Sequence, residues 1–123
     1  MKRALVIEDN EDNMKLITFI LGKHGYRTIE ARSGVQGIRM ALDEKPDFIL
    51  LDIQLPDMDG LDVLRTIRDS EADGQIPIIA ITSYAMSGDR GRLLQAGCNG
   101  YIEKPIDPET IVGEIRKLTG EKR

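Results

Sequence analysis

The chain has 123 residues, the size of one ordinary domain, and its 41% hydrophobic and 31% charged residues are typical of a globular rather than a disordered protein. Its net charge of −4 makes non-specific binding to nucleic acid or to an anionic membrane unfavourable, so we expect neither as a partner. The single cysteine excludes an internal disulfide framework and a cysteine-rich zinc site, and the single histidine excludes a helical pair of histidine ligands.

The amino-terminal segment does not have the pattern of a signal peptide or a membrane anchor. The apolar run Ala4–Ile7 is followed at once by Glu8 and Asp9, and it is too short for a signal peptide or a membrane-spanning helix. We therefore expect a cytoplasmic protein with a single domain over residues 1–123 and no effector domain.

The first half of the chain contains two strand–helix units. Ala4–Ile7 predicts a buried strand, and apolar residues at every third or fourth position over Met14–Leu21 predict a helix that ends at Gly25. The next strand candidate, Tyr26–Ala31, carries charged side chains and suits an exposed sheet edge. Ser33 then suits the N-cap of a second helix, whose apolar positions are Val35, Ile38 and Leu42.

The second half contains three more such units. The runs Phe48–Leu51 and Ile76–Ile81 do not alternate with polar residues, which is typical of strands buried on both faces of a parallel sheet. Asp59 suits the cap of a helix between them that contains Leu61, Leu64 and Ile67. Met86–Gly97 predicts only a short or mobile helix, because each of its internal glycines disfavours helix by about 1 kcal/mol. The last unit is a strand at Tyr101–Ile102 and a helix that starts at Asp107–Pro108 and ends near Gly120.

The strict alternation of strands and helices predicts an α/β fold. The sheet is expected to be mostly parallel with helices on both faces, because right-handed crossovers place them there. In an open sheet of this kind, ligands bind outside the carboxyl ends of the strands. The residues that follow the predicted strands are therefore the candidates for a functional site.

Four of the predicted strands end in polar or charged residues. These residues are Glu8, Asp9, Asp52, Thr82, Ser83 and Lys104. Three converging carboxylates repel one another, and a hard divalent cation such as Mg²⁺ relieves that repulsion. A cation together with Lys104 would hold an anionic group with several oxygens, such as a phosphoryl group. Asp52 follows a strongly apolar run, so we expect it to be the least solvated acid and the nucleophile.

Each of these residues alone has an ordinary structural explanation. Adjacent acids such as Glu8 and Asp9 often lie in a solvated loop or favour a helix N-terminus. Lys104 could be a loop lysine, and Thr82 could simply end a strand. Their joint placement at the carboxyl ends of four strands favours the functional interpretation.

The motifs that contain these residues resemble the receiver domain of two-component response regulators. The resemblance runs from Lys2 to about Leu118, and its motifs are Val6–Asn10, Leu51–Gly60, Ile81–Ser83 and Tyr101–Pro105. Asn10–Leu16, Asp52–Leu55 and Gly97–Cys98 are most similar to single-domain regulators of the DivK cell-division type. The resemblance implies a flavodoxin-like, doubly wound (βα)5 fold with a five-stranded parallel sheet in the order 2-1-3-4-5.

The resemblance also implies a metal site and a phosphate acceptor. Asp52 corresponds to the aspartate that accepts the phosphoryl group. Glu8 and Asp9 correspond to the acidic pair that binds Mg²⁺ together with Asp52 and the backbone carbonyl of Gln54, and Mn²⁺ could substitute.

The remaining site residues correspond to the switch of the family. Thr82 and Ser83 would contact the phosphoryl group, and Lys104 would pair with it. Tyr101 corresponds to the aromatic residue that moves inward when Thr82 moves. The bond before Pro105 is expected to be cis.

The implied function is signalling rather than metabolic catalysis. A histidine kinase or a histidine phosphotransfer protein would supply the phosphoryl group, and the protein would assist its own phosphorylation and slow dephosphorylation. A downstream protein would bind the face made by the fourth helix, the fifth strand and the fifth helix, and the protein would be a monomer or weak dimer. Gln54 and Tyr84 would border the path of the hydrolysing water. Tyr84 would either shield the phosphoryl group or point to solvent or a partner without a kinetic role.

Three other functions use related architectures. A haloacid-dehalogenase-type phosphohydrolase also attacks with an aspartate, but it has a second acid two residues later, where this chain has Gln54. A flavin binder needs a first loop rich in hydroxyls and glycine, and Glu8 and Asp9 would repel its phosphate. A pseudo-receiver would have the fold without the switch, and the complete set of site residues argues against it.

Overall fold

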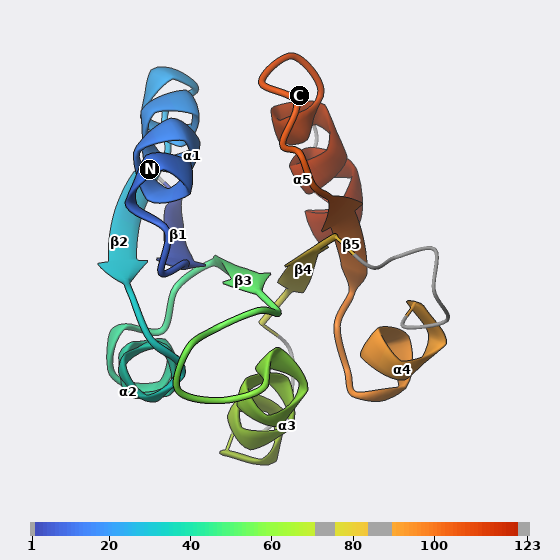
Figure 1. Ribbon diagram of the computed structural model, residues 1–123. Coiled ribbons are helices and arrows are strands. Elements are labelled where there is room, and N and C mark those ends of the chain that lie inside the picture. Colours follow the sequence, from blue (N-terminus) through green and yellow to red (C-terminus); the bar gives the residue numbers. More distant parts are fainter. Residues whose placement is uncertain (1, 71–75, 84–89, 121–123) are drawn as a thin grey trace.

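A computed structural model describes residues 2–70, 76–83 and 90–120. Within them, strands and helices alternate along the chain, as the sequence predicts (Figure 1). The strands are β1 (Arg3–Ile7), β2 (Arg27–Ala31), β3 (Phe48–Asp52), β4 (Ile78–Thr82) and β5 (Gly100–Glu103). The helices are α1 (Glu11–Lys23), α2 (Gly34–Glu44), α3 (Gly60–Ser70), α4 (Arg90–Gln95) and α5 (Ile111–Thr119).

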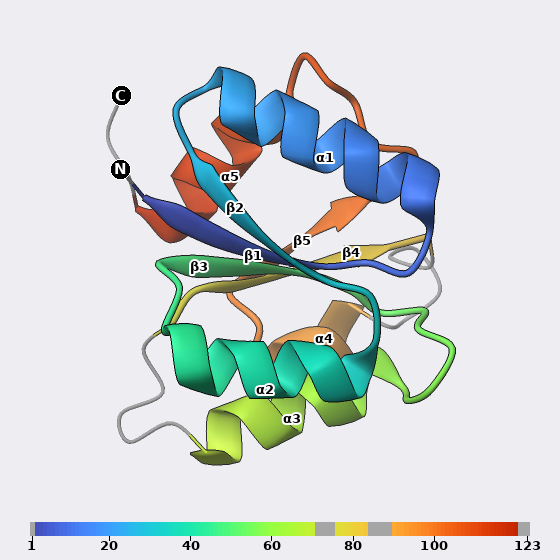
Figure 2. The same ribbon diagram turned by 90° about the vertical axis from the view of Figure 1, so that its left-hand side faces the viewer.

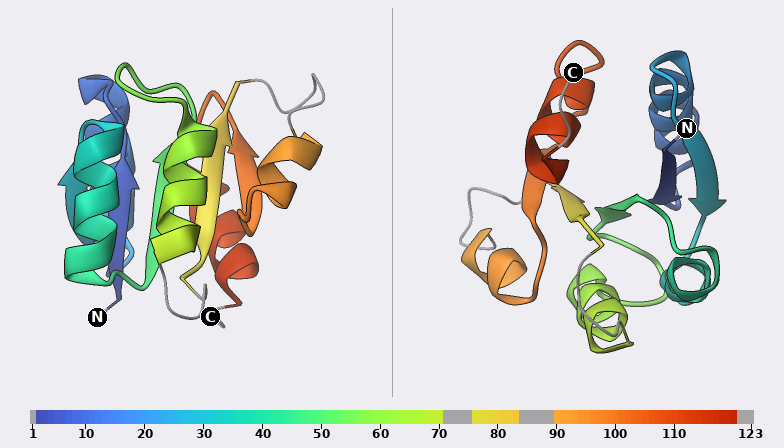
Figure 3. Two further views of the ribbon diagram at one scale, coloured as in Figure 1. Left: turned by 90° about the horizontal axis from the view of Figure 1, so that it is seen from below. Right: turned by 180° about the vertical axis from the view of Figure 1, so that it is seen from behind.

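The sheet is parallel throughout, and its strand order is β2-β1-β3-β4-β5, which confirms the predicted topology. Helices α1 and α5 cover one face, and α2, α3 and α4 cover the other (Figure 2, Figure 3). Every residue of β3 and β4 is buried, whereas β2 at the edge is mostly half-buried. The uninterrupted apolar runs thus became central strands, and the run with charged residues became an edge.

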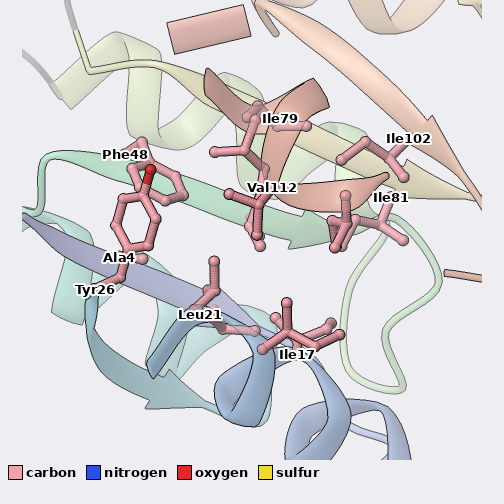
Figure 4. Close-up of a cluster of buried hydrophobic side chains, with 14 of the residues drawn as sticks. Ala4, Ile17, Leu21, Tyr26, Phe48, Ile79, Ile81, Ile102 and Val112 are labelled. Carbon is pink, nitrogen blue, oxygen red and sulfur yellow. The ribbon is translucent and has the colours of Figure 1, made fainter. Parts of the chain in front are cut away.

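Apolar side chains fill the space between the sheet and the helix pair α1–α5. Ile17 and Leu21 of α1 point into this layer together with Val112 of α5 and side chains of the central strands (Figure 4). The Tyr26 and Phe48 rings pack edge to face in the same layer, with their centroids 5.4 Å apart. This packing holds the strands and helices of this face together, and the residues that follow the strands are attached to this rigid core.

The helix caps largely follow the sequence signals. The Ser33 side chain accepts a hydrogen bond from the Gln36 amide at 3.1 Å and caps α2. The Asp59 carboxylate accepts one from the Leu61 amide at 2.9 Å at the start of α3. Gly25 has a φ of +88° just after α1, which only glycine adopts without strain.

Several boundaries differ from the prediction. Helix α5 begins at Ile111, because Asp107 instead accepts from the Glu109 amide in a preceding turn. Strand β4 begins at Ile78 rather than Ile76, since the intervening proline has no N–H for the ladder. Residues 86–89 of the predicted fourth helix lie outside the described residues, and α4 is a helix from Arg90 to Gln95.

Each helix in residues 2–70, 76–83 and 90–120 is too short or too polar to span a lipid bilayer.

Candidate functional site

The carboxyl ends of β1, β3 and β4 bring three buried polar residues to one edge of the sheet. Glu8, Asp52 and Thr82 are each 1% exposed. Glu8 continues the line of β1, since its amide donates to the Ala31 carbonyl of β2 at 2.9 Å. The sequence predicted Asp52 as the least solvated acid, and the structure shows that Glu8 is equally buried.

The Asp52 carboxylate is oriented by two donors. Its Oδ1 accepts a hydrogen bond from the Gln54 amide at 2.9 Å and pairs with Lys104 Nζ at 3.2 Å. Lys104 is itself largely buried and is held in place by its backbone, since its amide donates to the Thr82 carbonyl at 2.9 Å. An ion pair with so little solvent contact keeps much of its Coulomb attraction, so it fixes the geometry of both partners.

Glu8 faces Asp52 without a donor between the two carboxylates. Its Oε2 accepts from the Asn10 amide at 3.2 Å, but Oε1 is buried and has no hydrogen-bond partner among the described residues. Burial, followed by the proximity of Asp52, raises the pKa of Glu8 from 4.5 to about 7. The pair therefore needs a shared proton or a cation when Asp52 is ionised.

The acidic residues fit a divalent cation. One oxygen each from Glu8, Asp9 and Asp52 lies within 4.8 Å of the others, and Asp9 is exposed, so the cluster opens to solvent. Magnesium prefers such hard oxygen ligands and retains several waters, which the open side can admit. The unpartnered buried oxygen of Glu8 is the atom that a cation or its water would satisfy.

The other predicted residues surround this cluster. Ser83 is exposed and Tyr101 is half-buried, and the Lys104–Pro105 bond is cis, in agreement with the expectation. A cleft of about 360 Å³ lies beside Lys104, between α1 and the segment after β5. Its lining residues are Asn13, Leu16, Ser83, Lys104, Pro105 and Ile106. Tyr84 lies outside the described residues.

Residues 4–116 match the response regulator receiver domain family. The chain belongs to this family. It is 42% identical over 120 residues to the polar-differentiation response regulator DivK of Brucella ovis, covering 98% of each chain.

Two solved structures support the same assignment. The receiver domain of a Pseudomonas aeruginosa sensor histidine kinase has a TM-score of 0.88 and 37% identity, with 98% of each chain covered, and a magnesium ion is coordinated in its active site cleft. A CheY-like receiver domain of Methanospirillum hungatei has a TM-score of 0.89 and 28% identity, covering 98% of this chain and 94% of that one.

The receiver is thus a two-component signalling protein that works as a phospho-aspartate switch, and its acidic pocket is typical of a magnesium-binding phosphorylation site. Receiver domains take phosphoryl groups from histidine kinases or histidine phosphotransfer proteins.

Two polar contacts of this receiver had no counterpart in the sequence analysis. Asp57 accepts hydrogen bonds from the amides that begin α2. Arg68 of α3 donates to the carbonyls of Gly97 and Ile76. Both contacts join segments more than five residues apart in the chain, so no periodicity or cap signal indicates them.

Proposed function

We propose that Asp52 is the phosphate acceptor of this response regulator receiver domain. The observation that carries the proposal is the buried Asp52 carboxylate, held by Lys104 at 3.2 Å and the Gln54 amide at 2.9 Å beside an acidic cluster. An Asp52 oxygen would attack phosphorus, and the bond between phosphorus and the donor's histidine nitrogen would break. Lys104 would then face the phosphoryl oxygens and offset their charge.

Glu8, Asp9, Asp52 and the Gln54 backbone carbonyl would hold Mg²⁺. The bound cation would neutralise charge between the carboxylates and the incoming phosphoryl group. Mn²⁺ would substitute, because carboxylate, carbonyl and water ligands suit both ions. In this way the protein assists its own phosphorylation, although it turns over no metabolite.

Thr82 and Tyr101 would convert phosphorylation into a change of surface. Thr82 is buried at the end of β4, and Thr82 and Ser83 would contact the phosphoryl oxygens. Tyr101 is half-buried on β5, so inward and outward positions of its ring differ in burial. Phosphorylation would favour the inward position, which is a shift between two populations.

The downstream partner would bind the face of α4, β5 and α5. Tyr101 is on β5, and α4 carries an exposed apolar side chain, Leu94, with 48% of its surface accessible. The phosphoryl donor would be a histidine kinase or a histidine phosphotransfer protein, in the cytoplasm, and the receiver would act as a monomer or weak dimer.

The lifetime of the phosphoryl group would depend on Gln54 and Tyr84. Gln54 is exposed at the edge of the site and can orient a water, whereas Tyr84 would shield the phosphoryl group. We infer a slow loss of phosphate. The neutral Gln54 side chain at this position also disfavours a phosphohydrolase, which would need an acid there.

One experiment tests the proposal directly. The protein is incubated with Mg²⁺ and acetyl phosphate, and intact-mass spectrometry should show one acid-labile phosphoryl group. Asp52→Asn, which is nearly isosteric, should remove the label and keep the fold, and EDTA should also abolish labelling. A label that survives Asp52→Asn would place the acceptor elsewhere.

A further inference from the structure

The loop between β3 and α3 touches the phosphorylation site at its start. The Gln54 amide donates to Asp52 Oδ1 at 2.9 Å, so the position of this loop bears directly on the orientation of the acceptor carboxylate. The base of the loop is closed, because Gln54 pairs with Asp59 in an isolated bridge and the Gly60 amide donates to the Ile53 carbonyl at 3.0 Å. The residues between Gln54 and Asp59 project from this base.

The projecting part is tied to α2 by Asp57. Its Oδ1 accepts from the Gly34 amide at 2.8 Å, and its Oδ2 accepts from the Val35 amide at 3.1 Å. Figure 1 shows that the loop runs from β3 toward α2 and then turns back to α3. The two hydrogen bonds also lower the pKa of Asp57, which means that they favour its ionised form. Two oxygens on two amides fix the carboxylate in both position and direction.

Close packing surrounds this tie. A Cβ on Gly34 would lie 2.7 Å from Met58 Cγ and 2.9 Å from Val63 Cγ2, closer than real Cβ atoms approach such neighbours. Glycine at this position therefore lets the first turn of α2 approach the loop. The Met58 side chain thus packs against Gly34 beside the hydrogen bonds of Asp57.

Capping of α2 alone does not account for Asp57. The helix has its own N-cap, since Ser33 Oγ accepts from the Gln36 amide at 3.1 Å. The first turn of α2 contains no acidic residue, so the carboxylate that complements the helix dipole comes from another segment of the chain. Unlike Ser33, Asp57 links the β3–α3 loop, which contacts Asp52, to helix α2.

We propose that Asp57 is a positioning residue for the phosphorylation site, holding the β3–α3 loop against α2 so that the Gln54 peptide keeps its place beside Asp52. The inference rests on the proposed function of Asp52 and deepens it. The Gln54 amide orients the acceptor carboxylate, and the Gln54 carbonyl belongs to the proposed cation ligands. Loss of Asp57 would therefore affect both cation affinity and phosphorylation, without touching a group that reacts.

The test compares Asp57→Ala and Asp57→Asn with the matched control Ser33→Ala. All three act at the N-terminus of α2, but only the Asp57 variants release the loop. Mg²⁺ affinity is measured by isothermal titration calorimetry. The rate of phosphorylation by acetyl phosphate is then measured at saturating Mg²⁺, and urea denaturation reports the stability of each variant.

Asp57→Ala should weaken Mg²⁺ binding by about three- to tenfold, somewhat less than the loss of a group that contacts a metal ligand directly. It should also slow phosphorylation at saturating Mg²⁺. Asp57→Asn keeps one acceptor oxygen and should lie between wild type and Asp57→Ala. Ser33→Ala should lower stability and leave both site readings unchanged.

Two results would overturn the inference. If Asp57→Ala and Ser33→Ala both lower stability while Mg²⁺ affinity and phosphorylation stay at wild-type values, Asp57 is a helix cap only. If wild type itself neither binds Mg²⁺ nor is phosphorylated on Asp52, the proposed function fails and the inference fails with it. The wild-type measurement separates these two failures.

Discussion

Replacing Glu8 by glutamine should stabilise the cation-free protein at alkaline pH. The Glu8 carboxylate is buried beside Asp52, and one of its oxygens lacks a hydrogen-bond partner among the described residues. Glutamine has nearly the same shape and cannot ionise, so it removes one of the mutually repelling charges. The variant thus measures the free-energy cost of keeping the acidic cluster together.

The size of the effect follows from the pKa. Raising the pKa of Glu8 from 4.5 to about 7 corresponds to about 3 kcal/mol, at about 1.36 kcal/mol for each tenfold change in proton affinity. The folded state binds this proton more tightly than the unfolded state. The stabilising contribution of protonated Glu8 is therefore fully present below about pH 4.5 and is lost as the pH rises through about 7.

Urea denaturation in EDTA at pH 5, 6, 7 and 8, followed by circular dichroism, checks this prediction. Groups that titrate equally in both proteins drop out when the free energy of unfolding of wild type is subtracted from that of Glu8→Gln. This difference should become more positive by about 2–3 kcal/mol between pH 5 and pH 8. Added Mg²⁺ should stabilise wild type more than the variant at pH 8 and narrow the gap.

Glu11→Gln is the matched control. Glu11 is exposed, and its hydrogen bond with Arg32, at 2.6 Å, lowers the pKa of its carboxyl group. Glu11→Gln should therefore lower the free energy of unfolding at neutral pH, whereas Glu8→Gln should raise it at alkaline pH. A Glu8→Gln difference that is the same at pH 5 and pH 8 would refute the reasoning, because Glu8 would then not be strained by burial.

The other variants address the acceptor, the scaffold and the lifetime. Asp52→Asn should raise stability in EDTA at pH 8 by less than Glu8→Gln, since it removes a charge facing Glu8 but also removes the ion pair with Lys104; a larger rise than that of Glu8→Gln would contradict this. Arg68→Met should lower the free energy of unfolding by about 2–4 kcal/mol in urea denaturation, because carbonyl acceptors at 2.8 and 2.9 Å lose a charged donor. Tyr84→Ala should speed the loss of phosphate measured by intact mass, and equal decay of wild type, Tyr84→Ala and Tyr84→Glu would leave Tyr84 without a kinetic role.

The strands were predictable because they depend on short runs of residues, whereas their order was implied by the resemblance to receiver domains. Phe48–Leu51 is wholly apolar, so a buried central strand is the simplest outcome, and the acid that follows it must emerge at the carboxyl edge. The alternation of strands with helical patterns then limits the topology to a few choices. The clustering of Glu8 and Asp52 follows from these two arguments together.

Contacts between distant segments could not be predicted in the same way. Asp57 lies in a turn-like sequence, and nothing in that sequence indicates that its carboxylate meets the amides of Gly34 and Val35. The start of the last helix also differed from the prediction. Asp107 and Pro108 suit an N-terminus, yet the turn that they form precedes Ile111, where α5 begins.

The fixed position of Asp52 opposite Glu8 has two consequences. It lowers the stability of the ionised acidic cluster, and it makes the cluster respond to ligands. The fully buried strand β3 fixes Asp52 opposite Glu8, so the carboxylates cannot separate when both ionise. Lys104 contributes one positive charge beside Asp52, so it compensates only part of this negative charge. Any ligand that adds positive charge or takes up the Asp52 oxygen must therefore change the stability of the whole edge of the sheet. That edge includes the end of β4, where Thr82 lies, so the proposed switch would begin at Thr82.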